Sequence, residues 1–93
     1  MSVYVDGIIK WGNKGNWCHM VADTIEELHF MASKIGLKKE WFQEPGKAKT
    51  KVPHYDLRPS RRKLAILAGA IDSKEKLVEC CRKWKRNGEN NES

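Results

Sequence analysis

Three side chains that can exchange protons interrupt apolar stretches of the chain. His19 lies within residues 17–22, and His54 and Asp56 lie on either side of Tyr55. Histidine titrates near neutral pH, and a carboxylate can orient an imidazole or exchange a proton with it. We therefore predict His19, His54 and Asp56 as catalytic residues of a candidate site.

Each of these residues also has a purely structural interpretation. In a strand, His19 would share a face with Trp17 and Val21 and would be at least half buried, so a backbone carbonyl could satisfy its imidazole. His54 and Asp56 could hold a turn by bonding to nearby backbone groups. The residue types alone leave both interpretations open.

Cations gather directly after this triplet, around the predicted start of a helix that Ser60 would cap. A positive first turn opposes the helix dipole unless an anion binds there, so we predict a phosphate, sulfate or carboxylate site. A solvated basic helix end is the alternative. The predicted ligand-binding residues are Asp23, Tyr55, Arg58, Arg61 and Arg62.

An aromatic pair, Trp41 and Phe42, follows Lys38 and Lys39. Such a pair can stack on a nucleobase, and it can equally fill the core of a small domain. His29 is expected to pack at the edge of the core. Although several Asp and His residues are suitable metal ligands, their spacing matches no metal-binding motif. No metal and no cofactor are therefore predicted.

Two strands and three helices are predicted around these residues. The strands are residues 3–5, with residues 7–10 as an alternative extension, and residues 17–22. A capping box formed by Thr24 and Glu27 starts a helix that ends at Gly36. The second helix runs from Ser60 to about residue 69, and the third starts at residue 72, capped by Asp72. We expect a small α+β fold with about two short strands packed with three helices.

The predicted boundaries place a single domain at residues 1–86 and a disordered polar tail at residues 87–93. The Lys-rich segment 44–53 lacks apolar periodicity and is bracketed by prolines, so it is expected to be a solvated, mobile loop. A length of 93 residues leaves no room for a second domain.

Composition narrows the class of protein. The chain is 40% hydrophobic and 32% charged, which excludes a disordered polypeptide. Its net charge of +6 is concentrated in residues 34–63, which hold ten Lys and Arg against three Asp and Glu. No apolar run predicts a membrane span or a secretion signal. Three cysteines, two of them adjacent, do not make a disulfide framework, so a cytoplasmic location is expected.

A series of short motifs resembles one known family. The residues that carry the resemblance are Val3–Asp6, Cys18–Asp23, Glu27–His29, Ile35–Leu37, Trp41–Gln43, His54–Asp56 and Gly69–Ala70. In this order they resemble the domain-of-unknown-function 4031 family of small bacterial and bacteriophage proteins, over about Val3 to Ala70.

The resemblance implies a stand-alone prokaryotic or phage protein of the cytoplasm, the host cytoplasm if it is phage-encoded. It implies no reaction. It makes five residues polar positions of the family pattern: His19, Asp23, His54, Tyr55 and Asp56. The Lys-rich insert between Gln43 and His54 is where this chain is expected to depart from its relatives.

Three functions remain open. The favoured one is a pocket for a phosphorylated small molecule, nucleotide-like, which the protein would bind or hydrolyse. The alternatives are a basic accessory protein that binds nucleic acid and a phage protein that binds a host protein. We favour the pocket because polar His, Tyr and Asp side chains among core residues are costly to bury unless they are paired or used.

Overall fold

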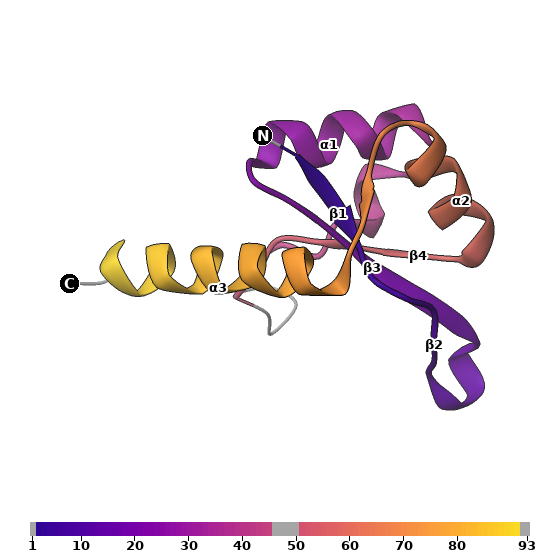
Figure 1. The fold of residues 1–93 in the computed structure, drawn as a ribbon, viewed down its shortest axis with the longest axis horizontal. Coiled ribbons are helices and arrows are strands. Elements are labelled where there is room, and N and C mark those ends of the chain that lie inside the picture. Colours follow the sequence, from indigo (N-terminus) through magenta and orange to yellow (C-terminus); the bar gives the residue numbers. More distant parts are fainter. Residues whose placement is uncertain (1, 46–50, 92–93) are drawn as a thin grey trace.

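Five short strands form a mixed sheet at the centre of the computed structural model, which describes residues 2–45 and 51–91, the last five by their backbone alone (Figure 1). The strands are β1 (Val3–Val5), β2 (Ile9–Lys10), β3 (Asn16–Ala22), β4 (Tyr55–Leu57) and β5 (Ile71–Asp72). The helices are α1 (Ile25–Lys34), α2 (Pro59–Leu67) and α3 (Lys74–Asn91), with 3₁₀ turns η1 (Gly12–Lys14) and η2 (Lys39–Trp41).

Strand β3 is the centre of this sheet, because it pairs with three others. β1 and β2 run antiparallel to β3 along one side, and β4 runs antiparallel to it along the other, with His19 opposite Asp56. β5 pairs in parallel with the far side of β1. β4 and β5 are therefore the edge strands, and β3 is the element that positions residues from both ends of the chain.

The α+β class is confirmed, but the expectation of about two strands understates the sheet. β1 and β3 are the two expected strands. β2 lies within residues 7–10, the predicted alternative extension of the first strand, and β5 has only two residues, too few for a periodic pattern to reveal it. β4 was interpreted as a turn, yet Tyr55 and Leu57 are buried and Asp56 points to the other face, which is the alternation of a half-buried strand.

Alternation along β3 divides the interior into two layers. Cys18 and Met20 point into the larger core, which lies beneath α1 and α2. Val21 points to the opposite face and packs against Leu77 and Cys80 of α3. Figure 1 accordingly shows α1 and α2 on one side of the sheet and α3 on the other. His19 has the same parity as Val21 and lies on the α3 face.

Helix ends agree with the sequence at α1 and differ at α2 and α3. Thr24 caps α1, since its Oγ1 accepts a hydrogen bond from the Glu27 N–H at 3.2 Å. The prediction of Ser60 as a cap was wrong: Arg58 is the N-cap of α2, without a side-chain cap bond, because Pro59 takes the first helical position. Helix α3 begins at Lys74 rather than residue 72, and the Ser73 Oγ accepts from the Lys76 N–H.

Two predicted segments fall partly outside the described residues. Residues 46–50 of the Lys-rich loop and residues 92–93 of the predicted tail are not described. The backbone of α3 continues to Asn91, into the segment for which a polar tail was predicted.

Replacing the α1 cap tests the local basis of this fold. Thr24→Ala removes the acceptor of the Glu27 N–H and should lower the free energy of unfolding by about 1 kcal/mol in urea denaturation. The control is Ser33→Ala, an exposed position on the same helix, which should change it by less than about 0.5 kcal/mol. Equal effects of the two substitutions would contradict the assigned cap.

Candidate functional site

Two histidine–aspartate pairs lie next to each other where β3 meets β4. Asp6 pairs with His19, and Asp56 pairs with His54. His19 and Asp56 are also direct cross-strand neighbours, and the centroids of the two imidazole rings are 5.8 Å apart. We call these four residues the quartet. The structure thus brings together all three residues predicted as catalytic and adds Asp6.

The Asp6–His19 pair is tightly constrained. The Asp6 carboxylate is 5% exposed, and it accepts a hydrogen bond from the His19 backbone N–H at 2.6 Å. Its second oxygen lies 2.7 Å from His19 Nδ1. A carboxylate at this position holds the proton on Nδ1 and leaves Nε2 as the ring nitrogen that faces outward from the pair. The His19 side chain keeps 33% of its surface exposed, so the imidazole is accessible.

Both members of this pair have shifted pKa values. The hydrogen bond to Asp6 raises the pKa of His19, against the opposing effect of partial burial. Burial works to raise the pKa of Asp6, but the hydrogen bonds from the side chain and backbone of His19 outweigh it and hold this pKa below its ordinary value. The pair is therefore an ion pair over a wider pH range than free imidazole and carboxylate would allow.

Arg62 fixes the backbone that carries Asp6. Its Nε donates to the Asp6 carbonyl at 2.8 Å, and one terminal nitrogen donates to Asp72 Oδ1 at 2.7 Å. Arg62 thereby joins α2 to the ends of β1 and β5. Arg62 was predicted to bind a ligand, whereas in this structure its guanidinium is engaged by the protein itself.

The second pair contains a carboxylate oxygen without a donor. His54 Nδ1 lies 2.9 Å from the Val52 carbonyl, so its proton is held there and Nε2 faces Asp56 Oδ1 at 3.5 Å. Asp56 Oδ1 is buried and has no hydrogen-bond partner among the described residues. A proton placed on His54 Nε2 would supply the missing donor. The quartet therefore presents two imidazoles, each beside a carboxylate.

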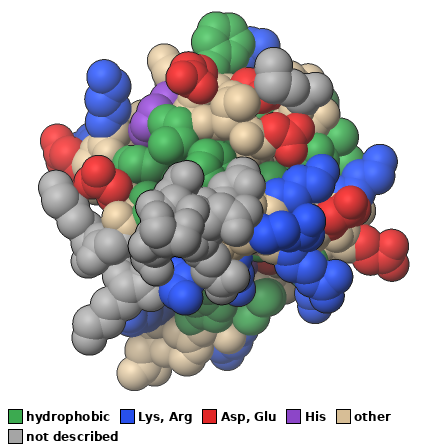
Figure 2. Space-filling view, turned by 90° about the vertical axis from the view of Figure 1, so that its left-hand side faces the viewer, with side chains coloured by type: hydrophobic (Ala, Val, Ile, Leu, Met, Phe, Trp, Pro, Cys, Tyr) green, Lys and Arg blue, Asp and Glu red, His purple; other side chains and the backbone are tan. Residues whose placement is uncertain are grey.

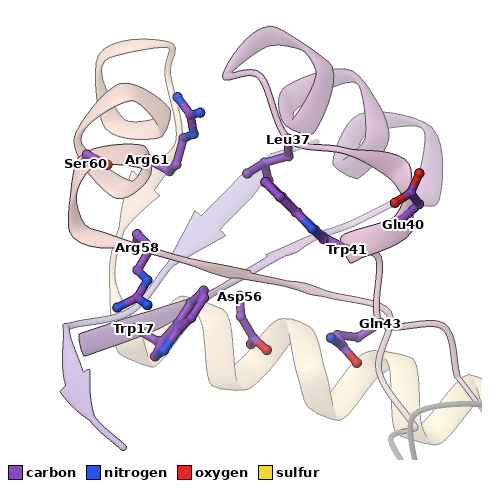
Figure 3. Close-up of a pocket in the computed structure, with 9 residues that line it drawn as sticks. All are labelled: Trp17, Leu37, Glu40, Trp41, Gln43, Asp56, Arg58, Ser60 and Arg61. Atoms are coloured by element: carbon purple, nitrogen blue, oxygen red, sulfur yellow. The ribbon is translucent and has the colours of Figure 1, made fainter. Parts of the chain in front are cut away.

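An open pocket of about 590 Å³ adjoins the quartet, and Asp56 belongs to both. Figure 3 shows its lining residues projecting from β3, β4, the start of α2 and the segment between α1 and β4. The lining residues are Trp17, Leu37, Glu40, Trp41, Gln43, Asp56, Arg58, Ser60 and Arg61. Indole rings, guanidinium groups and a helix N-terminus thus face one space.

The aromatic and cationic walls of the pocket have distinct supports. The Arg58 guanidinium lies 4.2 Å from the centre of the Trp17 ring, a cation–π contact that holds both side chains in place. Trp41 is 46% exposed, and Lys38 lies over its ring. Its neighbour Phe42 packs instead against His29 and Tyr55 in the core. The aromatic pair noted in the sequence therefore divides between a packing role and an exposed surface.

Two predicted ligand-binding residues lie away from this site. Tyr55 is fully buried on the α1 face, where its hydroxyl lies 2.9 Å from His29 Nδ1. Asp23 accepts hydrogen bonds from the Ser2 N–H and the Tyr4 hydroxyl near the start of the chain. Tyr55 lies on the opposite face of β4 from Asp56 because side chains alternate along a strand. Asp23 lies away from the site because it follows the end of β3.

Sequence reasoning missed Asp6 as a partner of His19. The available pattern is an acidic residue followed by Gly7 directly after an apolar run, which indicates the end of a strand but no partner for the carboxylate. Thirteen positions separate Asp6 from His19, and only the antiparallel pairing of β1 with β3 brings them together. The pocket residues Leu37, Glu40 and Gln43 were not predicted as site residues, although Leu37 and Gln43 lie in motifs of the family resemblance.

The described part of the chain contains neither clustered metal ligands nor a long apolar helix. No group of three or more His, Cys, Asp or Glu residues there is arranged to hold a metal ion. None of the helices in residues 2–45 and 51–91 combines the length and apolar character that crossing a bilayer requires.

Comparison with known sequences gives a family and no activity. The sequence model of the family described as Protein of unknown function (DUF4031) matches residues 3–84. The chain belongs to this family. The match extends past the Gly69–Ala70 motif through most of α3, so the DUF4031 unit includes the helix that covers the quartet face. No curated protein and no solved structure matches the chain.

The Asp6–His19 pair makes the stability of this DUF4031 protein depend on pH. Because the folded-state pKa of His19 lies above its unfolded value of about 6.5, its contribution is complete below that pH and is lost as the pH rises through the raised pKa. The contribution of Asp6 is present above its unfolded value of 3.8 and is lost as the pH falls through the lowered pKa.

NMR titration of the imidazole resonances should therefore give His19 a pKa above 6.5, and Asp6→Asn should lower it. Asp72→Asn is the matched control, since it also removes a carboxylate near Arg62 but none that bonds to His19. A wild-type His19 pKa below 6.5, or equal effects of the two variants, would contradict the described pair.

Proposed function

We propose that this protein binds a nucleoside phosphate in the pocket beside the quartet. The observation that carries the proposal is the combination, in one space, of two indole rings with two arginines. Planar bases stack on aromatic side chains, and guanidinium groups bind phosphate oxygens through paired N–H donors. The volume of about 590 Å³ lies in the range of pockets that hold small ligands.

The phosphate would bind at the start of α2. Arg58 and Arg61 form no ion pair with a described carboxylate, in contrast to Arg62. Ser60 lines the same space, and α2 has no side-chain cap, so the N–H groups of its first turn remain available to an anion. An anionic group here would also offset the unfavourable positive charge at this end of the helix.

The base would lie against Trp41 and Leu37, across the pocket from Arg58 (Figure 3). Trp41 is nearly half exposed, so its indole ring presents an apolar surface to the pocket. Stacking of a base would cover this surface.

A free nucleotide is favoured over a nucleic-acid strand as the occupant. The pocket is local, and Figure 2 shows Lys and Arg side chains interspersed with Asp and Glu over the face that it displays. A strand would require a continuous basic track, and its affinity would fall steeply with salt as counterions are released. The same base and phosphate chemistry could still come from one nucleotide of a strand, so the test includes both.

Calorimetric titration of the wild-type protein with nucleoside monophosphates and with single-stranded RNA, each at 50 and 300 mM salt, tests the proposal directly. We expect saturable binding of at least one mononucleotide, with only a modest loss of affinity at high salt. Binding of RNA but of no mononucleotide, with a steep salt dependence, would show that the protein binds a nucleic-acid strand and not a free nucleotide. No binding of any ligand would refute the proposal.

Substitution of the predicted phosphate ligand should weaken binding. Arg61→Ala removes a charge-assisted hydrogen bond to phosphate and should raise the Kd about tenfold or more. Lys63→Ala is the matched control, because it removes a cation of the same helix that does not line this pocket. Equal losses in the two variants would show a general effect of charge and contradict a specific phosphate site.

The proposed stacking surface has its own matched pair of variants. Trp41 and Phe30 are both exposed aromatic residues with a lysine over the ring, but only Trp41 lines the pocket. Trp41→Ala should weaken nucleotide binding by about 1–3 kcal/mol, and Phe30→Ala should leave the Kd unchanged. Retention of full affinity by the Trp41 variant would place the base elsewhere.

The quartet favours a second function, hydrolysis of the bound ligand. In this proposal a proton of the attacking water passes to the His54–Asp56 pair, and the Nε2 proton of His19 passes to the leaving group. Chromatography of the nucleotide after incubation detects release of either phosphate or base. His19→Gln should reduce any turnover at least about 100-fold while binding persists, and His29→Gln, outside the quartet, should not. Turnover that survives His19→Gln would refute this role.

A further inference from the structure

Strand β4 has an open outer edge, and the pairing of its neighbours fixes which residue faces outward. His54 and Gln43 exchange two backbone hydrogen bonds, of 2.9 and 3.3 Å, on the side away from β3. Backbone groups of alternate residues in an antiparallel strand point to opposite sides. The N–H and C=O of Asp56 therefore also point away from β3, whereas those of Tyr55 and Leu57 point toward it.

The chain leaves this edge just before it would cover Asp56. Continuing the antiparallel register from Gln43 and His54 would place Trp41 opposite Asp56, but the chain turns into η2, where the Trp41 N–H bonds to the Lys38 carbonyl at 3.0 Å. The outward N–H and C=O of Asp56 consequently have no hydrogen-bond partner among the described residues.

The missing strand segment is replaced by the pocket. Asp56 lines it, and so do Gln43 and Trp41, the residues between which the chain departs from the edge (Figure 3). A backbone donor and a backbone acceptor of one residue thus lie side by side next to an exposed indole ring. A ligand that displaces water from these two backbone groups leaves them without partners unless it supplies an acceptor beside a donor.

We propose that this edge selects adenine as the base of the bound nucleotide, an inference that rests on the proposed function. Adenine presents its N6 amino group as a donor next to N1, an acceptor, which matches the C=O and N–H of Asp56. Hypoxanthine and guanine present O6, an acceptor, next to N1–H, a donor. When the bound phosphate holds the base in the same orientation as adenine, each of these groups faces a like group of Asp56, so the same edge opposes them. Cytosine has the adenine pattern on a smaller ring, which covers less of Trp41.

Calorimetric titration with AMP, IMP, GMP and CMP separates this inference from the proposed function. A site that hydrogen-bonds a base edge rejects the analogue that reverses it, so we expect AMP to bind at least about tenfold more tightly than IMP and GMP, with CMP in between. Equal affinities for AMP and IMP would overturn base selection and leave nucleotide binding intact. Binding of none of the four would overturn the proposed function itself.

Amide hydrogen exchange tests the premise without any ligand. In the free protein the Asp56 amide should exchange much faster than those of Tyr55 and Leu57, which face β3. Saturating AMP should slow the Asp56 amide, and ribose 5-phosphate, which occupies only the phosphate end, should not. Slow exchange of Asp56 in the free protein would overturn the open edge, and equal protection by both ligands would overturn contact with the base.

Discussion

The buried carboxylate of Asp6 is the constraint on which this structure depends. It lies between the end of β1 and the middle of β3, where it takes hydrogen bonds from both the backbone and the imidazole of His19. A buried charge is tolerated only when it is paired and hydrogen-bonded. The residues that donate hydrogen bonds to it are therefore fixed in position. His19 is one of them, and because it lies opposite Asp56, the position of β4 is fixed relative to Asp6 as well.

The position of β3 explains why the polar residues gather in one place. One face of β3 is buried under α1 and α2, and His19, which has the opposite parity to Cys18 and Met20, lies on the other face. α3 covers that face only in part, around Val21, and the rest holds the quartet. Trp84 fixes the position of α3 by donating from its indole to the Ala22 carbonyl at 2.8 Å. The extent of this one helix thus decides where the sheet remains accessible.

Local patterns in the sequence were sufficient for part of this arrangement. The Thr24 cap and strands β1 and β3 followed from spacing and residue type. His19, His54 and Asp56 were selected by residue type, and the structure places them next to one another. Asp6 could not be predicted as a partner, because its role depends on strand register across a thirteen-residue separation. Asp23 and Tyr55 were grouped with the site by proximity in sequence, but the alternation of a strand directs Tyr55 to the other face. The pocket depends on where the chain leaves an edge, and no local pattern encodes that.

The brevity of β4 has a consequence for self-association. Exposed sheet edges recruit strands from other molecules, and proteins protect themselves by shortening or interrupting them. Here Pro59, which lacks an N–H, directly follows Arg58 at one end of the edge, and Gln43 already pairs with His54 at the other end. Between Gln43 and Pro59, Asp56 is the residue of this edge whose outward backbone groups remain unpaired among the described residues. An incoming strand would find one residue to pair with, so the protein can keep backbone groups uncovered without offering a template for aggregation.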